Sequence, residues 1–453
     1  MKFLESLKGS QTLIFGAGVT GTAAAEFLRD AGSKVNVIDE REESAEVIRS
    51  LEKISLAEQR LAVVSPGWRL DNPLVRSARG AGIEILSEID FAWRIKNEVN
   101  PGQIWVSLTG TNGKTTTVQM AEAMLKASGI DAKACGNVGD TAIANVAGSK
   151  HTHLILELSS FQLSWSEAAK FKASALLNIA EDHIDWHGSF SEYAKAKFKI
   201  AKMCEIFIAN SDDSVVKTGL SDLDRSAITY TLNTPAQGQI GLVEELIVDR
   251  AFATGDAEVI FELQDVKPAI PHNVSNAMAA SGLALSVGAK PAAISSSLKS
   301  FHLDHHRLEV VFEKEGVRWI DDSKATNPHA AKAALYSQES AIWIAGGLAK
   351  GADMDELVKS TSKRIKSAIL IGTDAPLIEA ALKKYAPQIP IQTLSLGKTG
   401  MELMREVVHL ANHQAASGDT VLLAPACASM DQFKDYADRG QCFANAVKEA
   451  LDV

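Results

Sequence analysis

The stretch Ile104-Trp-Val-Ser-Leu-Thr-Gly-Thr-Asn-Gly-Lys-Thr-Thr-Thr117 sets the architecture of the chain. Its apolar first part has the length of a buried strand, its glycines mark a tight turn, and the pattern that follows predicts a helix ending near Gly129. A glycine loop between a strand and a helix presents backbone N–H groups to phosphates, while Lys114 and the threonine hydroxyls add a cation and an Mg²⁺ ligand. The first glycine falls two residues later than in G-x-x-x-x-G-K-[ST], and Leu108 occupies the usual position. We therefore predict a shortened phosphate-binding loop rather than a glycine-rich turn with a solvated lysine.

A second glycine loop lies nearer the N-terminus. Gly16-Ala-Gly-Val-Thr-Gly21 follows an apolar strand at residues 12–15, and Asp39 ends the next strand, at residues 34–39. This is a βαβ unit that carries the dinucleotide fingerprint. Three interpretations stay open: an NAD or FAD site, glycines needed only for packing, and a helix N-terminus that binds the diphosphate of a UDP-sugar, with Asp39 and Arg41 near the nucleoside.

Alternating strands and helices fill the rest of the chain, so we predict an α/β fold of three domains. The first is Rossmann-like (residues 1–98) and ends in a polar linker at 96–102; the second is a P-loop ATPase-like parallel sheet (99–300) with an antiparallel patch within 228–263; the third is again Rossmann-like (301–453). The expected strands of the second and third domains are 153–158, 175–179, 206–209, 317–320, 341–345, 368–371 and 420–423, and a helix is expected at 276–287.

Composition narrows the classes of function. The 453 residues suit about three domains, and a net charge of −10 with 46% hydrophobic residues fits a globular protein rather than a nucleic-acid binder. No segment approaches the ~20 apolar residues of a membrane span, and the uncharged run after Gln11 fits a strand, turn and helix better than a signal peptide. The cysteines show no zinc spacing, so we expect free thiols in the cytosol; they are Cys135, Cys204, Cys427 and Cys442.

Polar residues at strand ends suggest a metal site. Glu157 ends an apolar strand and His183 follows the next one, so both are expected at the carboxyl edge of the sheet, where they can share Mg²⁺. A lone loop histidine is more often structural. The residues alone do not distinguish Lys197 from Lys195 and Lys199, and the default interpretation of all three is a solvated helix face.

The third domain presents polar groups after several strands. Three histidines at 302, 305 and 306 lack a regular ligand spacing, whereas Arg307 suits a phosphate contact. Residues 322–326, 346–350 and 424–433 each follow a strand and carry basic or hydroxyl groups. Carboxylate recognition is the natural use of such an edge.

Six motifs taken together resemble the Mur ligases, from the first strand almost to the C-terminus. Those shared by the superfamily, including folylpolyglutamate synthetases, are the loop 110–116, Glu157-Leu-Ser-Ser160, Glu181-Asp-His183 and His272-Asn-Val-Ser-Asn276. Asp322-Ser-Lys-Ala-Thr-Asn327 and Ala426-Cys-Ala-Ser-Met-Asp-Gln-Phe433 look like the branch that adds D-glutamate. The resemblance implies a cytoplasmic, monomeric, ATP- and Mg²⁺-dependent enzyme of peptidoglycan synthesis, which activates UDP-MurNAc-L-Ala as an acyl phosphate for attack by D-glutamate.

The resemblance also implies residue roles. The ATP site would comprise Gly110, Thr111, Asn112, Gly113, Lys114, Thr115, Thr116, Asn273, Asn276, Arg307 and Asp322. Thr115 would bind one of two Mg²⁺ ions, and Glu157, His183 and Lys197 the other, with Lys197 carbamylated by CO₂. Lys324 would lie near the reacting phosphate, and Lys114, His183, Lys197 and Lys324 would form the catalytic set. The UDP-substrate would contact Gly18, Val19, Thr20, Asp39, Arg41, Asn137 and Ser159, and D-glutamate would contact Thr326, Lys350, Ser429 and Tyr436.

Some positions depart from the family pattern, and two other functions compete. Tyr436 replaces another aromatic, Glu40 stands where a hydroxyl is common, and Leu348-Ala349 replaces a more polar turn. These changes affect individual contacts rather than the reaction class. The alternatives are a ligase of the same superfamily with another amino-acid acceptor, and an NAD-dependent oxidoreductase built on the first glycine loop, which would leave the loop at 110–116 without a role.

Overall fold

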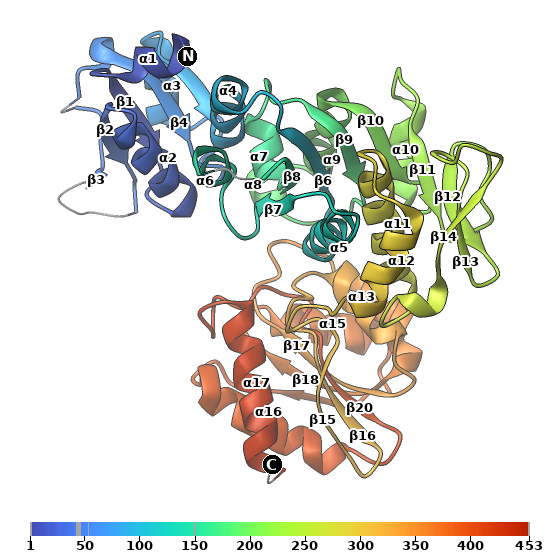
Figure 1. The fold of residues 1–453 in the computed structure, drawn as a ribbon. Coiled ribbons are helices and arrows are strands. Elements are labelled where there is room, and N and C mark those ends of the chain that lie inside the picture. The colour runs from blue at the N-terminus through green and yellow to red at the C-terminus, as the bar shows by residue number, and fades with distance from the viewer. Residues whose placement is uncertain (1, 42–46, 53, 149–150, 452–453) are drawn as a thin grey trace. The chain divides into compact units, whose positions relative to one another are not determined.

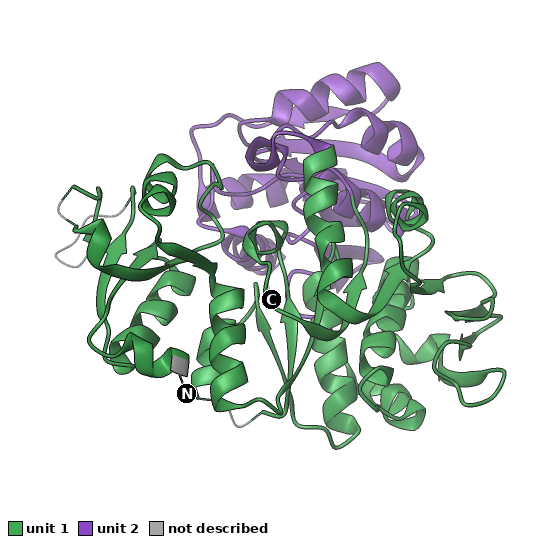
Figure 2. Cartoon of the chain, turned by 90° about the horizontal axis from the view of Figure 1, so that it is seen from above, with its two compact units in different colours: residues 1–179, 191–301 green, residues 180–190, 302–453 purple. Residues whose placement is uncertain are grey.

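A computed structural model describes residues 2–41, 47–52, 54–148 and 151–451. The chain forms two compact units (Figure 2): Met1–Ile179 with Ser191–Phe301, and Ala180–Phe190 with His302–Val453. Three sheets, two in the first unit and one in the second, confirm the predicted α/β class. The three domain boundaries stay a prediction.

The first sheet is parallel, in the order β3-β2-β1-β4-β5 (Figure 1). Its strands are β1 (Gln11–Phe15), β2 (Lys34–Ile38), β3 (Val47–Ile48), β4 (Gln59–Val64) and β5 (Glu84–Ser87), and its helices are α1 (Lys2–Leu7), α2 (Val19–Asp30), α3 (Pro73–Gly80) and α4 (Glu88–Val99). The strand order reverses between β1 and β4, which is where open α/β sheets bind ligands beyond their carboxyl ends. The loop between β1 and α2 lies at this point.

The predicted linker at residues 96–102 is wrong in its first part, because α4 continues to Val99. Lys96 is buried there: its ammonium lies 4.5 Å from the Trp93 ring centroid and donates to the carbonyl of Pro101 at 3.2 Å. The aliphatic stem of this lysine packs against its neighbours while the ammonium donates to a carbonyl. A polar residue can therefore be buried in the last turn of the helix, although its residue type suggested a linker.

The second sheet has nine strands in the order β14-β13-β12-β11-β10-β9-β6-β8-β7. They are β6 (Ile104–Thr109), β7 (Ala132–Gly136), β8 (His153–Glu157), β9 (Phe171–Leu176), β10 (Cys204–Asn210), β11 (Ile228–Thr231), β12 (Gln239–Val243), β13 (Leu246–Asp249) and β14 (Glu258–Glu262). The antiparallel patch predicted at 228–263 is confirmed only for β12, β13 and β14, because β11 pairs in parallel with both β10 and β12. Alternating polarity indicates a half-buried strand and not its direction.

Helices around this sheet position the loop at 110–113. They are α5 (Lys114–Ala127), α6 (Ala142–Ala147), α7 (Ser160–Trp165), α9 (Phe190–Phe198), α10 (Ser214–Ser221), α11 (Pro271–Leu285) and α12 (Pro291–Ser300). The predicted helix at 276–287 therefore begins five residues earlier, at Pro271. Small side chains make α11 buried along most of its length and let it approach α5 and the sheet closely.

Two carboxylates at the start of α4 connect the first sheet to the elements of the second. Asp90 accepts the backbone N–H groups of residues 167, 168 and 169 at 2.8, 2.9 and 2.9 Å. Glu88 accepts the N–H of Ile143 at 2.7 Å, and burial raises the pKa of Glu88 to about 7. The Trp165 indole donates to the carbonyl of Trp68 at 2.8 Å. These bonds tie both sheets into one compact unit.

The third sheet forms the core of the second unit, in the order β15-β16-β20-β17-β18-β19. Its strands are β15 (Glu309–Lys314), β16 (Val317–Asp321), β17 (Ala341–Gly346), β18 (Ile365–Ile371), β19 (Ile391–Thr393) and β20 (Thr420–Leu423); only β15 pairs antiparallel. One face packs against α13 (Pro328–Tyr336), α14 (Asp355–Thr361) and α15 (Ala375–Tyr385), and the other against α16 (Gly400–Gln414) and α17 (Tyr436–Ala450). The carboxyl ends of β16, β20 and β17 are therefore neighbours.

The structure also bears on the cysteines and on membrane-spanning helices. All four cysteines are free thiols, as predicted. Among the described residues, helices fall short of the length and apolarity that crossing a membrane requires.

Candidate active site

The loop after β6 is held in shape by its own chain. Gly113 adopts φ 82° and starts α5, and the Lys114 ammonium reaches back to donate to the carbonyls of Gly110 at 3.0 Å and Thr111 at 2.8 Å. Asn178, which sequence reasoning missed, accepts the Asn112 N–H at 2.8 Å and donates to its carbonyl at 3.0 Å. The backbone of the loop predicted to bind phosphate is thus organised by the protein itself.

Asn276 of α11 lies directly against this loop. A Cβ added to Gly113 would lie 2.3 Å from the side-chain oxygen of Asn276, so only glycine fits beside it. Asn273, one turn earlier, donates to the carbonyl of Pro268 at 3.0 Å. The structure brings Asn276 to the predicted nucleotide loop and gives Asn273 a partner within its own segment.

Lys197 is distinguished from its neighbours by burial. Its side chain is only 1% exposed, and its ammonium donates to the carbonyl of Gly110 at 2.7 Å and to the hydroxyl of Thr109 at 3.4 Å. Tyr193, one turn earlier on α9, is also buried and pairs its hydroxyl with that of Thr111 at 2.9 Å. The i,i+4 spacing of Tyr193 and Lys197 puts both on one helix face, a signal in the sequence that our interpretation missed.

Glu157 offers a carboxylate oxygen that no donor reaches in the part of the chain that the structure describes. The side chain is 2% exposed at the carboxyl end of β8, where Glu157 pairs with Leu108, and its Oε1 accepts the amide of Asn137 at 2.8 Å. Its Oε2 has no hydrogen-bond partner among the described residues. A buried, unpartnered carboxylate oxygen is unfavourable alone and is satisfied by a hard divalent cation. With Thr115 and Thr116 buried in the first turn of α5, the donors present fit Mg²⁺.

Two residues predicted to contact the UDP-substrate already have protein partners. Asn137 donates its backbone N–H to the carbonyl of Glu157 at 2.8 Å, in addition to the amide bond above. Ser159 starts α7 in a capping box with Gln162, accepting its N–H at 3.1 Å and donating its own to the glutamine side chain at 2.9 Å. Their substrate roles stay a prediction.

Close packing explains the spacing of glycines in the first loop. A Cβ on Gly21 would lie 1.8 Å from the carbonyl oxygen of Gly16, and one on Gly16, at φ 109°, would lie 2.6 Å from the hydroxyl of Ser65. That hydroxyl is buried and has no hydrogen-bond partner among the described residues. Ser65, at the end of β4, is a candidate polar group that sequence reasoning missed.

The start of α2 presents an open helix end. Asp39 accepts the N–H groups of Ala17 at 2.8 Å and Arg41 at 2.9 Å, so its carboxylate braces the loop. Gly18 precedes the helix without a side-chain cap, and Val19 is 77% exposed. An exposed apolar residue beside uncapped N–H groups suits a ligand with a diphosphate and an apolar face. Thr20 lies in the first turn of α2, and Arg41 follows β2.

His183 belongs to the second compact unit and stands just before α8 (Ile184–His187). Its backbone is left-handed, at φ 54°, and its Nε2 lies 3.6 Å from the carboxylate of Asp182. A metal site shared with Glu157 and Lys197 stays a prediction.

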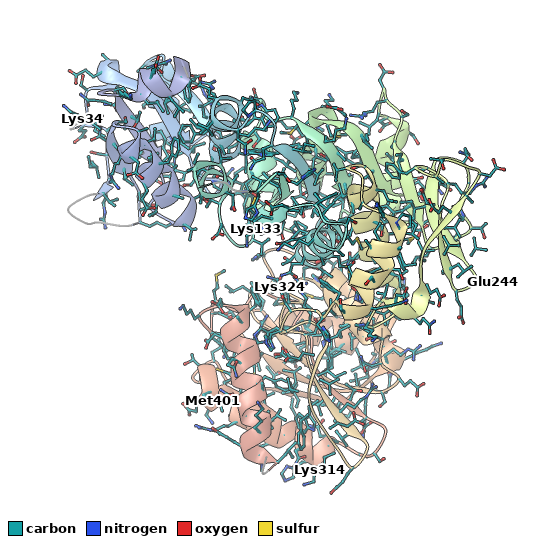
Figure 3. All side chains as sticks on the ribbon, viewed as in Figure 1. Lys34, Lys133, Glu244, Lys314, Lys324 and Met401 are labelled. Atoms are coloured by element: carbon teal, nitrogen blue, oxygen red, sulfur yellow. The ribbon has the colours of Figure 1, made fainter. Side chains whose placement is uncertain are left out.

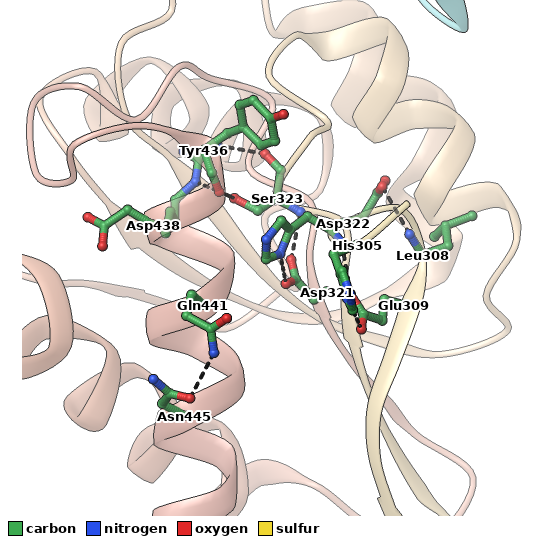
Figure 4. A network of polar contacts seen from close by, with 12 residues as sticks. His305, Leu308, Glu309, Asp321, Asp322, Ser323, Tyr436, Asp438, Gln441 and Asn445 are labelled. Carbon is green, nitrogen blue, oxygen red and sulfur yellow. Dashed lines mark hydrogen bonds and ion pairs between the residues drawn. The ribbon is translucent and has the colours of Figure 1, made fainter. Parts of the chain in front are cut away.

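In the second unit, the buried Asp321 ends β16 and the half-buried Asp322 follows it (Figure 4). Asp321 bonds to the His306 ring at 2.6 Å, which raises the pKa of that histidine. Burial raises the pKa of Asp322 to about 7, and this carboxylate accepts the N–H of Leu308 at 3.2 Å. His306, Asp321 and Glu309 offer ligand atoms within 4.8 Å of one another, but Glu309 accepts the His306 N–H, so this network is internally bonded. Arg307 stands between His306 and Leu308, two residues that these bonds hold.

The residues expected to meet an amino acid gather at the same edge of the third sheet. Figure 3 shows Lys314 at one end of this sheet and Lys324 at the other, and the Lys324 ammonium lies 3.6 Å from the Tyr436 ring centroid. Thr326 donates its N–H to the Lys324 carbonyl, Lys350 follows β17 with φ 52°, and Ser429 is buried after β20. A bridge between residues 348 and 428 joins the last two loops.

Comparison with known proteins matches three family models in order. They are Mur ligase MurD-like, N-terminal domain (residues 10–87), Mur ligase middle domain (108–284) and Mur ligase, glutamate ligase domain (306–427). The chain is 42% identical to a UDP-N-acetylmuramoylalanine--D-glutamate ligase of Streptomyces coelicolor and 42% identical to that of Thermobifida fusca, in each case over 98% of this chain and 99% of the relative.

Solved structures share the fold over nearly the whole chain. A pseudomurein peptide ligase type C from Methanothermus fervidus gives a TM-score of 0.62 at 17% identity, covering 98% of this chain and 100% of the other. MurF from Acinetobacter baumannii gives a TM-score of 0.61 at 17% identity, covering 98% of this chain and 92% of the other. These likenesses support the predicted three-domain α/β fold.

Proposed function

The chain belongs to the Mur ligase family, and from that premise we propose that it is an ATP-dependent ligase that joins D-glutamate to UDP-N-acetylmuramoyl-L-alanine in peptidoglycan synthesis. The observation that carries the proposal is the match to D-glutamate ligases over 98% of this chain and 99% of each relative. The organised loop at 110–113 supports the use of ATP.

The reaction is one of carboxylate activation. A carboxylate oxygen of the substrate attacks the γ-phosphorus of ATP, ADP leaves, and the product is an acyl phosphate. The amine nitrogen of D-glutamate then attacks the acyl carbon, the amine loses a proton, and inorganic phosphate leaves with the electron pair of the broken C–O bond. Two anions must meet in the first step, so positive charge at the phosphates lowers the barrier.

Residues of the first unit would hold the nucleotide phosphates. The N–H groups of the loop and the Lys114 ammonium bind phosphate oxygens, and Asn276 contacts the nucleotide beside Gly113. Thr115 would hold one Mg²⁺ and Glu157 a second, and each ion when bound neutralises phosphate charge. The unpartnered oxygen of Glu157 supports that assignment.

Lys197 is proposed to carry a carbamate formed with CO₂. The modification would turn a buried cation into a carboxylate that serves the second Mg²⁺ together with Glu157 and His183. The burial of this lysine beside the loop, in contrast to Lys195 on the same helix, supports a special role.

The remaining residues are assigned to the nucleotide, the D-glutamate and the UDP-substrate. Arg307, Asp322 and Lys324 would serve the nucleotide and the reacting phosphate, and Thr326, Lys350, Ser429 and Tyr436 the D-glutamate. The start of α2 at residues 18–20 and the loop after β2 with residues 39 and 41 would bind the UDP-substrate, together with Asn137 and Ser159. We further propose that the enzyme acts in the cytoplasm as a monomer.

The two alternatives make different predictions. A different amino-acid acceptor would keep the loop and Glu157, but the full-length matches are to ligases named for D-glutamate. An NAD-dependent oxidoreductase would leave the Mur ligase middle domain at 108–284 without a role.

The test is phosphate release from Mg-ATP with UDP-MurNAc-L-Ala and, in separate reactions, D-glutamate, L-glutamate, L-alanine and a diamino acid. We expect turnover with D-glutamate alone and its loss in Lys114→Ala. Turnover with another amino acid would retain the mechanism and reassign the acceptor, whereas no turnover with any of them by folded protein would refute the proposal.

A further inference from the structure

One arginine lies completely buried beneath the polar edge of the third sheet. Arg439, in the first turns of α17, has 0% exposure. Its Nε donates to the hydroxyl of Ser323 at 2.9 Å and its Nη2 to the carbonyl of the same residue at 2.9 Å. Its Nη1 donates to the carbonyls of Cys427 at 3.1 Å and Gly346 at 3.4 Å. Every nitrogen of the guanidinium is therefore in use.

The three partners come from three different segments. Ser323 follows β16 between Asp322 and Lys324, Gly346 ends β17 four residues before Lys350, and Cys427 stands two residues before Ser429. Ser323 also donates its hydroxyl to the carbonyl of Tyr436 at 2.7 Å, a bond drawn in Figure 4. One planar side chain thus fixes the relative positions of the segments that carry the residues assigned to D-glutamate.

Among the described residues no carboxylate is paired directly with this arginine, although Asp431 and Asp321 act on its charge from nearby. Its acceptors are carbonyls and a hydroxyl, and among the described residues it makes no ion pair. Burial lowers the pKa of Arg439 to about 10, which still leaves the guanidinium charged at neutral pH. A buried, unpaired charge is unfavourable and acts over a longer range than an exposed one. A nearby anionic ligand would offset part of this cost.

We infer that Arg439 is a positioning residue for the amino-acid acceptor: it holds the three segments in register, and its charge favours a dianionic acceptor such as D-glutamate. The inference rests on the proposed function. It assigns specificity to a residue that touches loop backbone rather than substrate.

The test compares Arg439→Ala and Arg439→Lys with the wild type, and uses Arg405→Ala as a matched control. Arg405 is a largely exposed arginine of the same unit, paired with Glu449 at 2.8 Å. We expect both Arg439 variants to raise the KM for D-glutamate at least tenfold, while the KM for UDP-MurNAc-L-Ala stays within twofold. Arg405→Ala should change neither constant.

Chemical rescue tests whether the charge of the Arg439 guanidinium contributes, in addition to its hydrogen bonds. Thermal melts test whether each variant folds. Guanidinium at low millimolar concentration should lower the KM of Arg439→Ala for D-glutamate again, whereas urea, a neutral molecule of similar shape, should not. Thermal melts identify any variant that does not fold; Arg439→Lys, which retains the charge, then carries the test.

An unchanged KM for D-glutamate in a folded variant would overturn the inference, as would an equal rise for both substrates. Rescue by urea equal to that by guanidinium would overturn the part that concerns charge. A wild-type enzyme that does not use D-glutamate would instead be a failure of the proposed function, so the two failures are distinguishable.

Discussion

Replacing Gly113 by alanine probes the contact between the phosphate loop and α11. Gly113 has φ 82°, a left-handed conformation that costs an L-residue roughly 1–2 kcal/mol. The new Cβ would also lie 2.3 Å from the Asn276 side-chain oxygen, which forces the amide or the loop to move at a cost of about 1–2 kcal/mol more. We expect Gly113→Ala to lower the free energy of unfolding by about 2–4 kcal/mol in total.

The other end of the same helix supplies the control. Gly129 has φ 77°, and a Cβ added there meets nothing within 4 Å. Gly129→Ala should therefore lower the free energy of unfolding only by the conformational cost, about 1–2 kcal/mol. The two variants differ by the contact with Asn276 alone, so their difference measures that contact.

Urea denaturation and ADP titration calorimetry check both consequences. Because 1.4 kcal/mol corresponds to a factor of ten in affinity, a displaced loop should weaken ADP binding about tenfold or more in Gly113→Ala and not in Gly129→Ala. The double variant Gly113→Ala/Asn276→Ala should regain about 1–2 kcal/mol of stability relative to the sum of the single changes. Equal stability and equal ADP affinity of the two glycine variants would refute this reasoning.

Three further predictions concern carboxylates of the first unit. Asp90→Asn should lower the free energy of unfolding by about 2–3 kcal/mol, because the amide cannot accept all three N–H groups that Asp90 binds; a loss below about 0.5 kcal/mol would contradict this. Glu88 has a folded-state pKa of about 7, above its ordinary 4.5, so the folded state holds the proton more tightly and stability falls as pH rises from 4.5 through 7. Relative to Glu88→Gln, the wild type should lose up to about 3 kcal/mol of unfolding free energy across that pH range, measured by urea denaturation. Parallel pH profiles of the two proteins would exclude the effect. Glu157→Gln should raise the Mg²⁺ concentration for half-maximal activity at least tenfold and leave metal-free ADP binding unchanged; an unaltered Mg²⁺ requirement would remove Glu157 from the metal site.

The strands and loops that carry strong local signals were predictable. Apolar runs that lead into a glycine form β1 and β6, and apolar runs that end next to Asp39 and at Glu157 form β2 and β8. The structure places all four strands where those runs occur. Short or half-exposed strands escaped prediction: β3 has two residues, and β19 has three, of which two are exposed. Such edge strands bury too little apolar surface to leave a periodic pattern.

Local pattern also failed where tertiary packing decides a side chain's environment. Arg439 stands in Asp435-Tyr-Ala-Asp-Arg-Gly440, which has the composition of a solvated helix start, yet the structure buries it completely. Lys197 was indistinguishable from Lys195 by residue type and differs from it by burial. Both cations donate to acceptors that lie far away in the sequence, so the residues around each cation do not indicate that it is buried.

The most direct test of the central claim follows oxygen through the reaction. UDP-MurNAc-L-Ala labelled with ¹⁸O in both carboxylate oxygens is incubated with the enzyme, Mg-ATP and D-glutamate. The masses of the products are then measured by mass spectrometry. We predict a D-glutamyl adduct that retains one ¹⁸O and inorganic phosphate that gains the other, because the acyl phosphate passes one carboxylate oxygen to phosphorus. No adduct from folded enzyme, or an adduct formed without transfer of ¹⁸O to phosphate, would contradict the account.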